Sequence, residues 1–236
     1  MTERERILFL AIVSEHIRTS HPVASQVIVD KYLPDLSPAT IRNDMARLEE
    51  RGLIEQPHTS AGRIPTAYGY EYYVENFLPE KAIEKKLQHR LQGAYASKRL
   101  AQADRIREVA KTLADLSSES VVVSSTDREL FYTGLANLFR QPEFAERDVV
   151  YSFSEMIDRL DEVMASIFDQ VGPEVTILMG RKNPFGRDCG VMLTKYSIDD
   201  EEGMIGILGP MRMAYAEHRA LLRYAQDLLN NSRTHD

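Results

Sequence analysis

The chain has 236 residues, of which 43% are hydrophobic and 28% charged, a composition typical of one large or two ordinary globular domains. No run approaches 18 consecutive apolar residues and the N-terminus carries charges of both signs, so we expect a cytoplasmic protein with no membrane contact and no secretion signal. The net charge of −7 argues against a non-specific nucleic-acid coat, and the single cysteine, Cys189, excludes an internal disulfide.

Two helices are predicted at the start of the chain. Residues 3–19 carry an apolar stripe at helical spacing, which His21-Pro22 ends. A short second helix is expected over residues 26–33, with Ser25 as its N-cap. Its inward side chains are expected to be Val27, Ile28 and Tyr32.

The third predicted helix begins at Pro38, because Ser37 is a good N-cap and proline costs nothing at the first helical position. Gly52 is the expected C-terminal stop. The buried face of this helix is narrow and consists of Ile41, Met45 and Leu48. Three short helices with a tight turn before the third predict a helix-turn-helix.

A β hairpin, or wing, is predicted after the third helix. Residues 53–56 are expected to form a short strand, 57–62 a polar loop and 63–65 the returning strand. Thr66 is the expected N-cap of an aromatic-rich helix. We therefore expect a winged helix-turn-helix domain over residues 1–78.

The rest of the chain predicts an α+β arrangement. Residues 79–117 are charged, carry apolar residues at helical spacing and are expected to form a helical connector, with either a break or a loosely helical middle at Gly93. Ser152 and Glu155 are expected to form a capping box, and a last helix spans about Tyr215 to Asn230. Strands are expected near residues 121–123, 130–132, 175–179, 191–196 and 204–208. Residues 118–236 therefore predict a sheet flanked by helices.

The third helix is the candidate DNA reader, because recognition helices read base edges with residues near their own N-terminus. Arginine pairs with guanine and asparagine with adenine, each pair contributing about 1–3 kcal/mol of discrimination. The candidate contacts are Ser37, Thr40, Arg42, Asn43 and Arg47 in the helix, and His58, Thr59, Ser60 and Arg63 in the wing. The alternative is a solvated helix face beside a polar turn. The first 80 residues contain eight basic and twelve acidic residues, so DNA binding must depend on where the arginines point.

Two long strings favour the DNA-binding interpretation. Residues 36–45, LSPATIRNDM, and residues 56–66, QPHTSAGRIPT, closely resemble the recognition helix and wing of the bacterial heat-inducible transcription repressor family (HrcA). Residues 134–138, 141–144 and 206–215 resemble that family's C-terminal domain, which is GAF-like. The resemblance covers roughly residues 4–78 and 129–231.

The resemblance implies a repressor of chaperone and chaperonin operons. Such a protein binds an inverted-repeat operator in double-stranded DNA as a homodimer and releases it on heat stress, with a chaperonin as a further partner. Family members have an additional segment between about Leu113 and Gly134 that includes a helical dimerisation element. The resemblance therefore implies that residues 118–236 form an abbreviated GAF-like regulatory domain.

Other classes of function stay open. GAF-like folds often hold small molecules, so a ligand-sensing regulator is the main alternative, and a protein–protein adaptor is the third. The six histidines show no His-Glu-x-x-His pairing, and Gly203, Gly206 and Gly209 lack the dinucleotide-binding spacing. Residues 199–202 are expected to be a solvated acidic turn rather than a cation site. We therefore expect no enzyme, and no catalytic residue, cofactor or metal.

Two helices are candidates for the dimer contact. The last helix carries one apolar seam that suits a second copy or the protein's own sheet, with the sheet slightly favoured. This seam consists of Tyr215, His218, Leu222, Ala225 and Leu229. The helical connector is the second candidate and the one that we favour. Its seam consists of Leu87, Leu91, Ile106 and Leu113.

Overall fold

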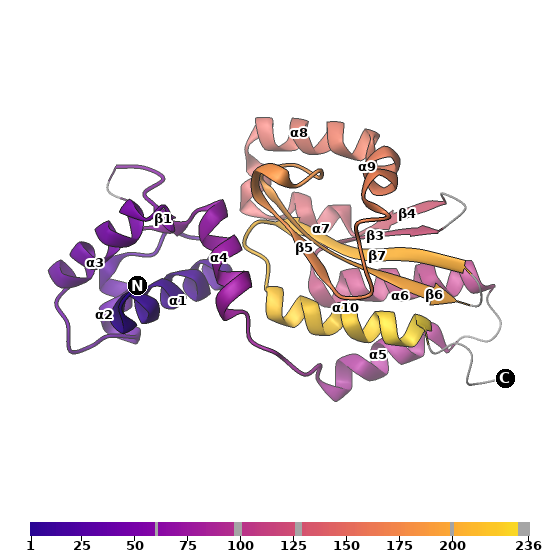
Figure 1. The fold of residues 1–236 in the computed structure, drawn as a ribbon, viewed down its shortest axis with the longest axis horizontal. Coiled ribbons are helices and arrows are strands. Elements are labelled where there is room, and N and C mark those ends of the chain that lie inside the picture. The colour runs from indigo at the N-terminus through magenta and orange to yellow at the C-terminus, as the bar shows by residue number, and fades with distance from the viewer. Residues whose placement is uncertain (60, 97–100, 126–128, 199–200, 231–236) are drawn as a thin grey trace. The chain divides into compact units, whose positions relative to one another are not determined.

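The structure, a computed structural model, describes residues 1–59, 61–96, 101–125, 129–198 and 201–230. The chain divides into two compact units, Met1–Leu78 and Pro79–Asp236 (Figure 1). The first is built from helices and a small hairpin, and the second from a five-stranded sheet with helices on both faces. The expected mixture of helix and sheet is confirmed.

The first unit opens with three helices, α1 (Glu3–Thr19), α2 (Ser25–Lys31) and α3 (Pro38–Glu50). Thr2 and Glu5 form a capping box at the start of α1, in which each side chain accepts a hydrogen bond from the other residue's backbone N–H. Ser37 caps α3 as predicted, because its Oγ accepts a hydrogen bond from the Thr40 N–H at 3.1 Å. The helix-turn-helix is confirmed.

The second helix differs from its prediction in two respects. Ala24 rather than Ser25 is the N-cap, and no side chain caps this end. Ile28 is buried as expected, but Tyr32 is exposed and was wrongly predicted to point inward. The Tyr32 hydroxyl donates a hydrogen bond to the Glu15 carboxylate at 2.8 Å, which explains why the ring lies at the surface.

The predicted wing is present after α3. It consists of β1 (Ile54–Glu55) and β2 (Ile64–Pro65), which pair antiparallel, and α4 (Ala67–Phe77) follows. Val23 and Arg63 exchange two backbone hydrogen bonds of 2.9 Å, which attach the hairpin to the segment before α2. Glycine is required at position 62, because a Cβ there would lie 2.4 Å from the Val23 carbonyl. Thr66 caps α4 as predicted, accepting a hydrogen bond from the Gly69 N–H.

The second unit is organised around an antiparallel sheet of order β4-β3-β7-β6-β5. The strands are β3 (Ser120–Ser125), β4 (Leu130–Thr133), β5 (Thr176–Leu178), β6 (Cys189–Ile198) and β7 (Glu201–Pro210). All five expected strands are confirmed. Gly203, Gly206 and Gly209 lie in β7. Of the expected acidic turn, residues 199–200 lie outside the described residues, and Glu201 and Glu202 belong to β7 instead.

Two helices, α6 (Gln102–Ser117) and α10 (Tyr215–Asn230), cover one face of this sheet, and α5 (Lys85–Tyr95) packs against them (Figure 1). Helix α6 packs on β3, and α5 packs on α6 and α10, so the segment expected as a connector lies within the second unit. The expected break is present, because α5 and α6 are separate helices, but Gly93 itself lies inside α5, which ends at Tyr95. Both predicted dimer seams are used internally. The last helix buries its whole seam against its own unit, and the connector buries Leu91 and Leu113.

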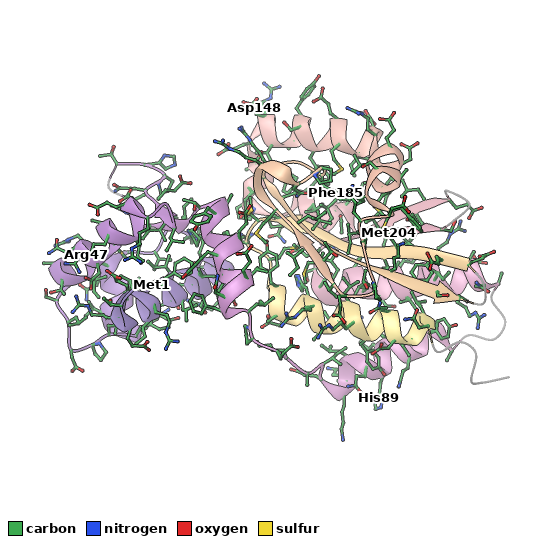
Figure 2. The ribbon with its side chains drawn as sticks, viewed as in Figure 1. Met1, Arg47, His89, Asp148, Phe185 and Met204 are labelled. Carbon is green, nitrogen blue, oxygen red and sulfur yellow. The ribbon has the colours of Figure 1, made fainter. Side chains whose placement is uncertain are left out.

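The other face of the sheet is covered by α7 (Leu135–Phe139), α8 (Arg147–Asp158) and α9 (Leu160–Ile167), with short 3-10 turns η1 (Pro142–Ala145) and η2 (Gly180–Lys182). Phe185 and Met204 lie in the core between this layer and the sheet (Figure 2). The predicted capping box of Ser152 and Glu155 is wrong, because α8 begins at Arg147 and Ser152 lies inside it. The helix extends upstream because partly buried Val149 and Val150 also pack on this core.

Candidate nucleic-acid interface

Helix α3 has one buried and one exposed face. Ile41, Met45 and Leu48 are at most 3% exposed, as predicted. Arg42 and Asn43 lie on the exposed face, and neither side chain forms a hydrogen bond or ion pair within the described part of the chain. Their guanidinium and amide groups therefore keep all of their donors and acceptors for an outside partner.

The first turn of α3 forms a small polar surface. The Ser37 and Thr40 hydroxyls lie 3.0 Å apart, and Ser37 is exposed. Pro38 occupies the first helical position, where the backbone needs no N–H donor. The N-terminus of a helix carries partial positive charge and unpaired N–H groups, so this end suits a phosphate.

Arg47 lies one turn further along α3 and is 57% exposed (Figure 2). Its Nη1 is 3.3 Å from Asp44 Oδ1 and 3.9 Å from Glu5 Oε1, so it is already partnered in the free protein. The Asp44 carboxylate is only 2% exposed and also accepts hydrogen bonds from Arg4 Nε at 2.7 Å and Nη2 at 3.0 Å. This network ties α1 to α3, and sequence reasoning missed it.

Part of the negative charge of the first unit is buried and neutralised. Burial raises the pKa of Glu15, but hydrogen bonds from Arg18, Tyr32 and Lys31 outweigh it and bring the pKa to about 2. The backbone N–H of Thr2 chiefly lowers the pKa of Glu5, with a contribution from nearby Arg51. Glu5, Glu15 and Asp44 are all buried beside arginines. The count of acidic residues therefore overstates the negative charge that this unit presents to a partner.

The wing residues fall into two groups. His58 and Thr59 are exposed near the tip, and Ser60 lies outside the described residues. Arg63 is different, because its side chain is only 19% exposed and its Nε and Nη2 both lie 3.0 Å from Glu49 Oε2. Arg63 therefore links the wing to α3 in the free protein.

A hollow of about 350 Å³ lies between α3 and the wing. Its lining consists of Ala24, Ser25, Arg42, Met45, Gln56, Ala61, Gly62 and Arg63. Of the predicted DNA contacts, the structure thus brings Arg42 and Arg63 together here. Ser37 and Thr40 lie at the start of α3, and Arg47 is held by carboxylates of α1 and α3.

Three further findings concern metal-ligand clusters, the single cysteine and membrane-spanning helices in the described part of the chain. Among them, no group of three histidine, cysteine or acidic side chains is placed to hold a metal ion. Burial raises the pKa of the Cys189 thiol to about 12, so its nucleophilic thiolate form is suppressed. No helix in the described ranges is long and apolar enough to span a membrane.

These features define a class of protein. Three helices followed by a hairpin, with unpaired arginine and asparagine on the third helix, form a winged helix-turn-helix of the kind that transcription regulators use. An α+β domain follows it in the chain.

The chain belongs to the HrcA family. The family's sequence profile, described as the HrcA protein C terminal domain, matches residues 71–218. The resemblance predicted from the sequence is therefore confirmed, and the match lies mainly in the second unit.

Relatives across bacteria support the same family. The heat-inducible transcription repressor HrcA of Carboxydothermus hydrogenoformans is 26% identical over 336 aligned positions, covering 97% of this chain and 98% of the relative. That of Moorella thermoacetica is 38% identical, covering 97% of this chain and 64% of the relative. That of Pelotomaculum thermopropionicum is 40% identical over 129 positions, covering 55% of this chain and 37% of the relative. Because 336 aligned positions exceed the 236 residues here, at least 100 positions of the first relative have no counterpart.

A solved structure has the same fold. The crystal structure of a hypothetical protein at 2.2 Å resolution superimposes with a TM-score of 0.78 and 20% identity, covering 98% of each chain. At this identity the likeness concerns the fold alone.

Proposed function

We propose that this chain is a sequence-specific DNA-binding repressor of heat-shock genes. The observation that carries the proposal is the unpaired state of Arg42 and Asn43 on the exposed face of a capped helix. The names of its relatives, heat-inducible transcription repressors, supply the class of target genes.

In this proposal α3 enters the major groove of operator DNA. Arg42 donates to a guanine edge and Asn43 pairs with an adenine edge, while the Ser37 and Thr40 end of the helix receives a phosphate. Arg47, one turn further along α3, reaches the phosphate backbone of the DNA. Exposed His58 and Thr59 place the wing, with its neighbour Ser60, against the adjoining strand.

An inverted-repeat operator requires two copies of α3 related by a two-fold axis, so we propose that the chain acts as a homodimer. Heating then lowers the population of folded dimer, and operator binding falls by mass action. A chaperonin that refolds the repressor would restore binding. The work of such a protein is binding rather than catalysis, and it takes place in the cytoplasm, where the chromosome lies.

The experiment that tests the proposal is genome-wide mapping of occupied DNA, before and after a heat shift, in cells that express the full chain. We expect occupied sites upstream of chaperone and chaperonin operons, lost on heating. The variant Arg42→Ala/Asn43→Ala should lose these sites. The matched control Arg187→Ala, which removes a cation that is 82% exposed in the second unit, should keep them. Occupancy unrelated to such operons, or retained by the double variant, would contradict the proposal.

A second candidate is a ligand-sensing regulator. It is favoured by a cavity of about 540 Å³ between β3, β4 and α9, lined by apolar, hydroxyl and acidic side chains. The lining includes Ser124, Leu130, Asp161, Met164, Phe168 and Asp169. Adding candidate metabolites to the purified full chain separates the two functions, because a sensed ligand should raise the melting temperature and also change operator affinity.

A further inference from the structure

We propose that Glu49 and Arg63 are positioning residues that hold the wing in place for DNA, and that Arg63 does not itself contact DNA. This inference rests on the proposed function. It assigns a role to Glu49, an acidic residue on the proposed DNA-reading helix, and it changes the role expected for Arg63.

The Arg63 side chain forms an ion pair with Glu49 of α3. Its Nε and Nη2 both lie 3.0 Å from Glu49 Oε2, and its side chain is 19% exposed. Its backbone N–H and carbonyl are committed as well, because both form hydrogen bonds with Val23. The guanidinium thus directs two of its nitrogens at Glu49, and the low exposure of the side chain leaves a phosphate little access to the rest of it.

The wing depends on such attachments because its own ladder is very short. Strands β1 and β2 have two residues each, and an isolated two-stranded hairpin is at best marginally stable in water. Gln56 Nε2 donates a hydrogen bond to the Ala61 carbonyl at 3.0 Å across the base of the loop. Buried Ile54 of β1 packs the hairpin near α3, and the Glu49–Arg63 ion pair adds a polar side-chain link between the two.

The same ion pair leaves Arg42 available. Positions 42 and 49 are two turns apart on α3, and Arg42, Met45 and Arg63 all line the hollow between α3 and the wing. Glu49 pairs with Arg63, whereas Arg42 has no partner within the described part of the chain. One arginine therefore fixes the hairpin and the other stays free for a base edge.

The inference makes an unusual prediction about sign. Removing an acidic side chain from a DNA-binding surface ordinarily strengthens binding, because repulsion of phosphates falls. If Glu49 positions the wing, Glu49→Gln should instead weaken binding. Glu50→Gln is the matched control, since exposed Glu50 is the next residue of α3 and has no partner among the described residues.

The test uses the full chain and a DNA duplex that the parent chain has selected from a random pool. Glu49→Gln, Arg63→Gln and the double variant should each bind about 3- to 10-fold more weakly, and the double variant no more weakly than the weaker single. Arg63→Gln should leave the slope of log affinity against log salt unchanged, because no phosphate contact is lost. Glu50→Gln should bind equally or more tightly. Hydrogen exchange at the Ala61, Gly62 and Arg63 amides should accelerate in Glu49→Gln but not in Glu50→Gln.

Several outcomes would overturn the inference. Tighter binding by Glu49→Gln, a salt slope lowered by about one in Arg63→Gln, or additive losses in the double variant would make Arg63 a direct DNA contact. Unchanged exchange at the wing amides would remove the positioning role. If the parent chain selects no duplex at all, the proposed function fails, and the exchange measurement alone still decides whether this ion pair orders the wing.

Discussion

Asp44 holds two arginines of the first unit from a buried position. Its carboxylate accepts two hydrogen bonds from Arg4 and lies 3.3 Å from Arg47 Nη1. Both guanidinium groups are about half exposed, so without Asp44 they would still form hydrogen bonds with water. The free energy lost on substitution of Asp44 therefore comes mainly from the buried hydrogen bonds that its carboxylate accepts.

We therefore expect Asp44→Asn to lower the free energy of opening of α3 by about 1–3 kcal/mol. Native-state hydrogen exchange of the α3 amides in the full chain measures this quantity. Glu3→Gln is the control, because the Glu3–Arg6 pair is exposed on both sides and should contribute less than about 0.5 kcal/mol. Equal effects of the two substitutions would refute a special role for Asp44.

Glu119 is a buried carboxyl group beside β3, and its Oε2 has no hydrogen-bond partner among the described residues. Burial raises its pKa to about 8, which Arg212 opposes and Glu143 reinforces. The unfolded chain releases this proton near the ordinary value of 4.5, so the folded state holds a proton that the unfolded state has lost. The bound proton on Glu119 therefore stabilises the folded state fully below pH 4.5, and this stabilisation is lost as the pH rises from 4.5 toward 8.

Between pH 6.5 and 8 the free energy of unfolding should fall by about 2 kcal/mol in the parent chain and stay nearly flat in Glu119→Gln. This pH range lies outside the ranges in which two other buried groups affect stability. Burial lowers the pKa of His218 from 6.5 to about 4, so its effect on the free energy of unfolding lies mainly between these two values. Burial raises the pKa of Cys189 from 9, so its effect begins only near pH 9. Urea unfolding followed by circular dichroism measures the effect. Exposed Glu155→Gln is the control and should behave like the parent. A steep fall that persists in Glu119→Gln would contradict this assignment.

Two glycines in helices differ in what surrounds them. A Cβ at Gly69 in α4 would lie 2.0 Å from the Leu53 carbonyl oxygen, whereas a Cβ at Gly93 in α5 would meet nothing within 4 Å. Helix α4 therefore needs glycine at position 69 to pack against the backbone of Leu53, just before β1. Helix α5 has room for a larger residue at position 93. The same residue type has opposite consequences in the two elements.

We expect Gly69→Ala to destabilise the first unit by about 1–3 kcal/mol, because the clash is with backbone that cannot turn aside. Gly93→Ala should stabilise the second unit by about 0.5–1 kcal/mol, since alanine is the better helix former. Thermal melting of the two variants checks the signs. A stabilised Gly69→Ala or a destabilised Gly93→Ala would show that the packing around these helices differs from the structure.

The elements that the sequence predicted correctly have local signals. Ser37-Pro38 and Thr66 begin helices through contacts within three residues, and the five strands follow from short apolar runs. Ser152 misled the prediction because a capping pattern can also occur inside an amphipathic helix.

The long-range pairs of the candidate site had no local signal. Arg4 and Asp44 are 40 residues apart, and Arg63 meets Glu49 only after the hairpin has folded back. Exposed Arg42 and Asn43 could be predicted from the spacing of the buried face of α3. The partners of Arg47 and Arg63 could not, because they depend on how separate elements pack.

At the scale of the whole molecule, the apolar seams that the sequence offered for dimerisation serve the fold of the second unit. Leu91, Leu113 and Leu222 are fully buried there. A two-fold partner must therefore bind through side chains other than these. The relatives' additional positions, at least 100 in the Carboxydothermus protein, are absent from this chain.

The most direct test of the central claim is the sequence preference of the full chain in a random pool of DNA duplexes, compared with that of Arg42→Ala/Asn43→Ala. We predict that the parent enriches an inverted repeat whose half-sites contain guanine and adenine, and that the double variant loses the preference at those two bases by about 10-fold or more each. No enriched sequence from the parent, or the same sequence enriched by the double variant, would contradict the claim that α3 reads DNA through these two side chains.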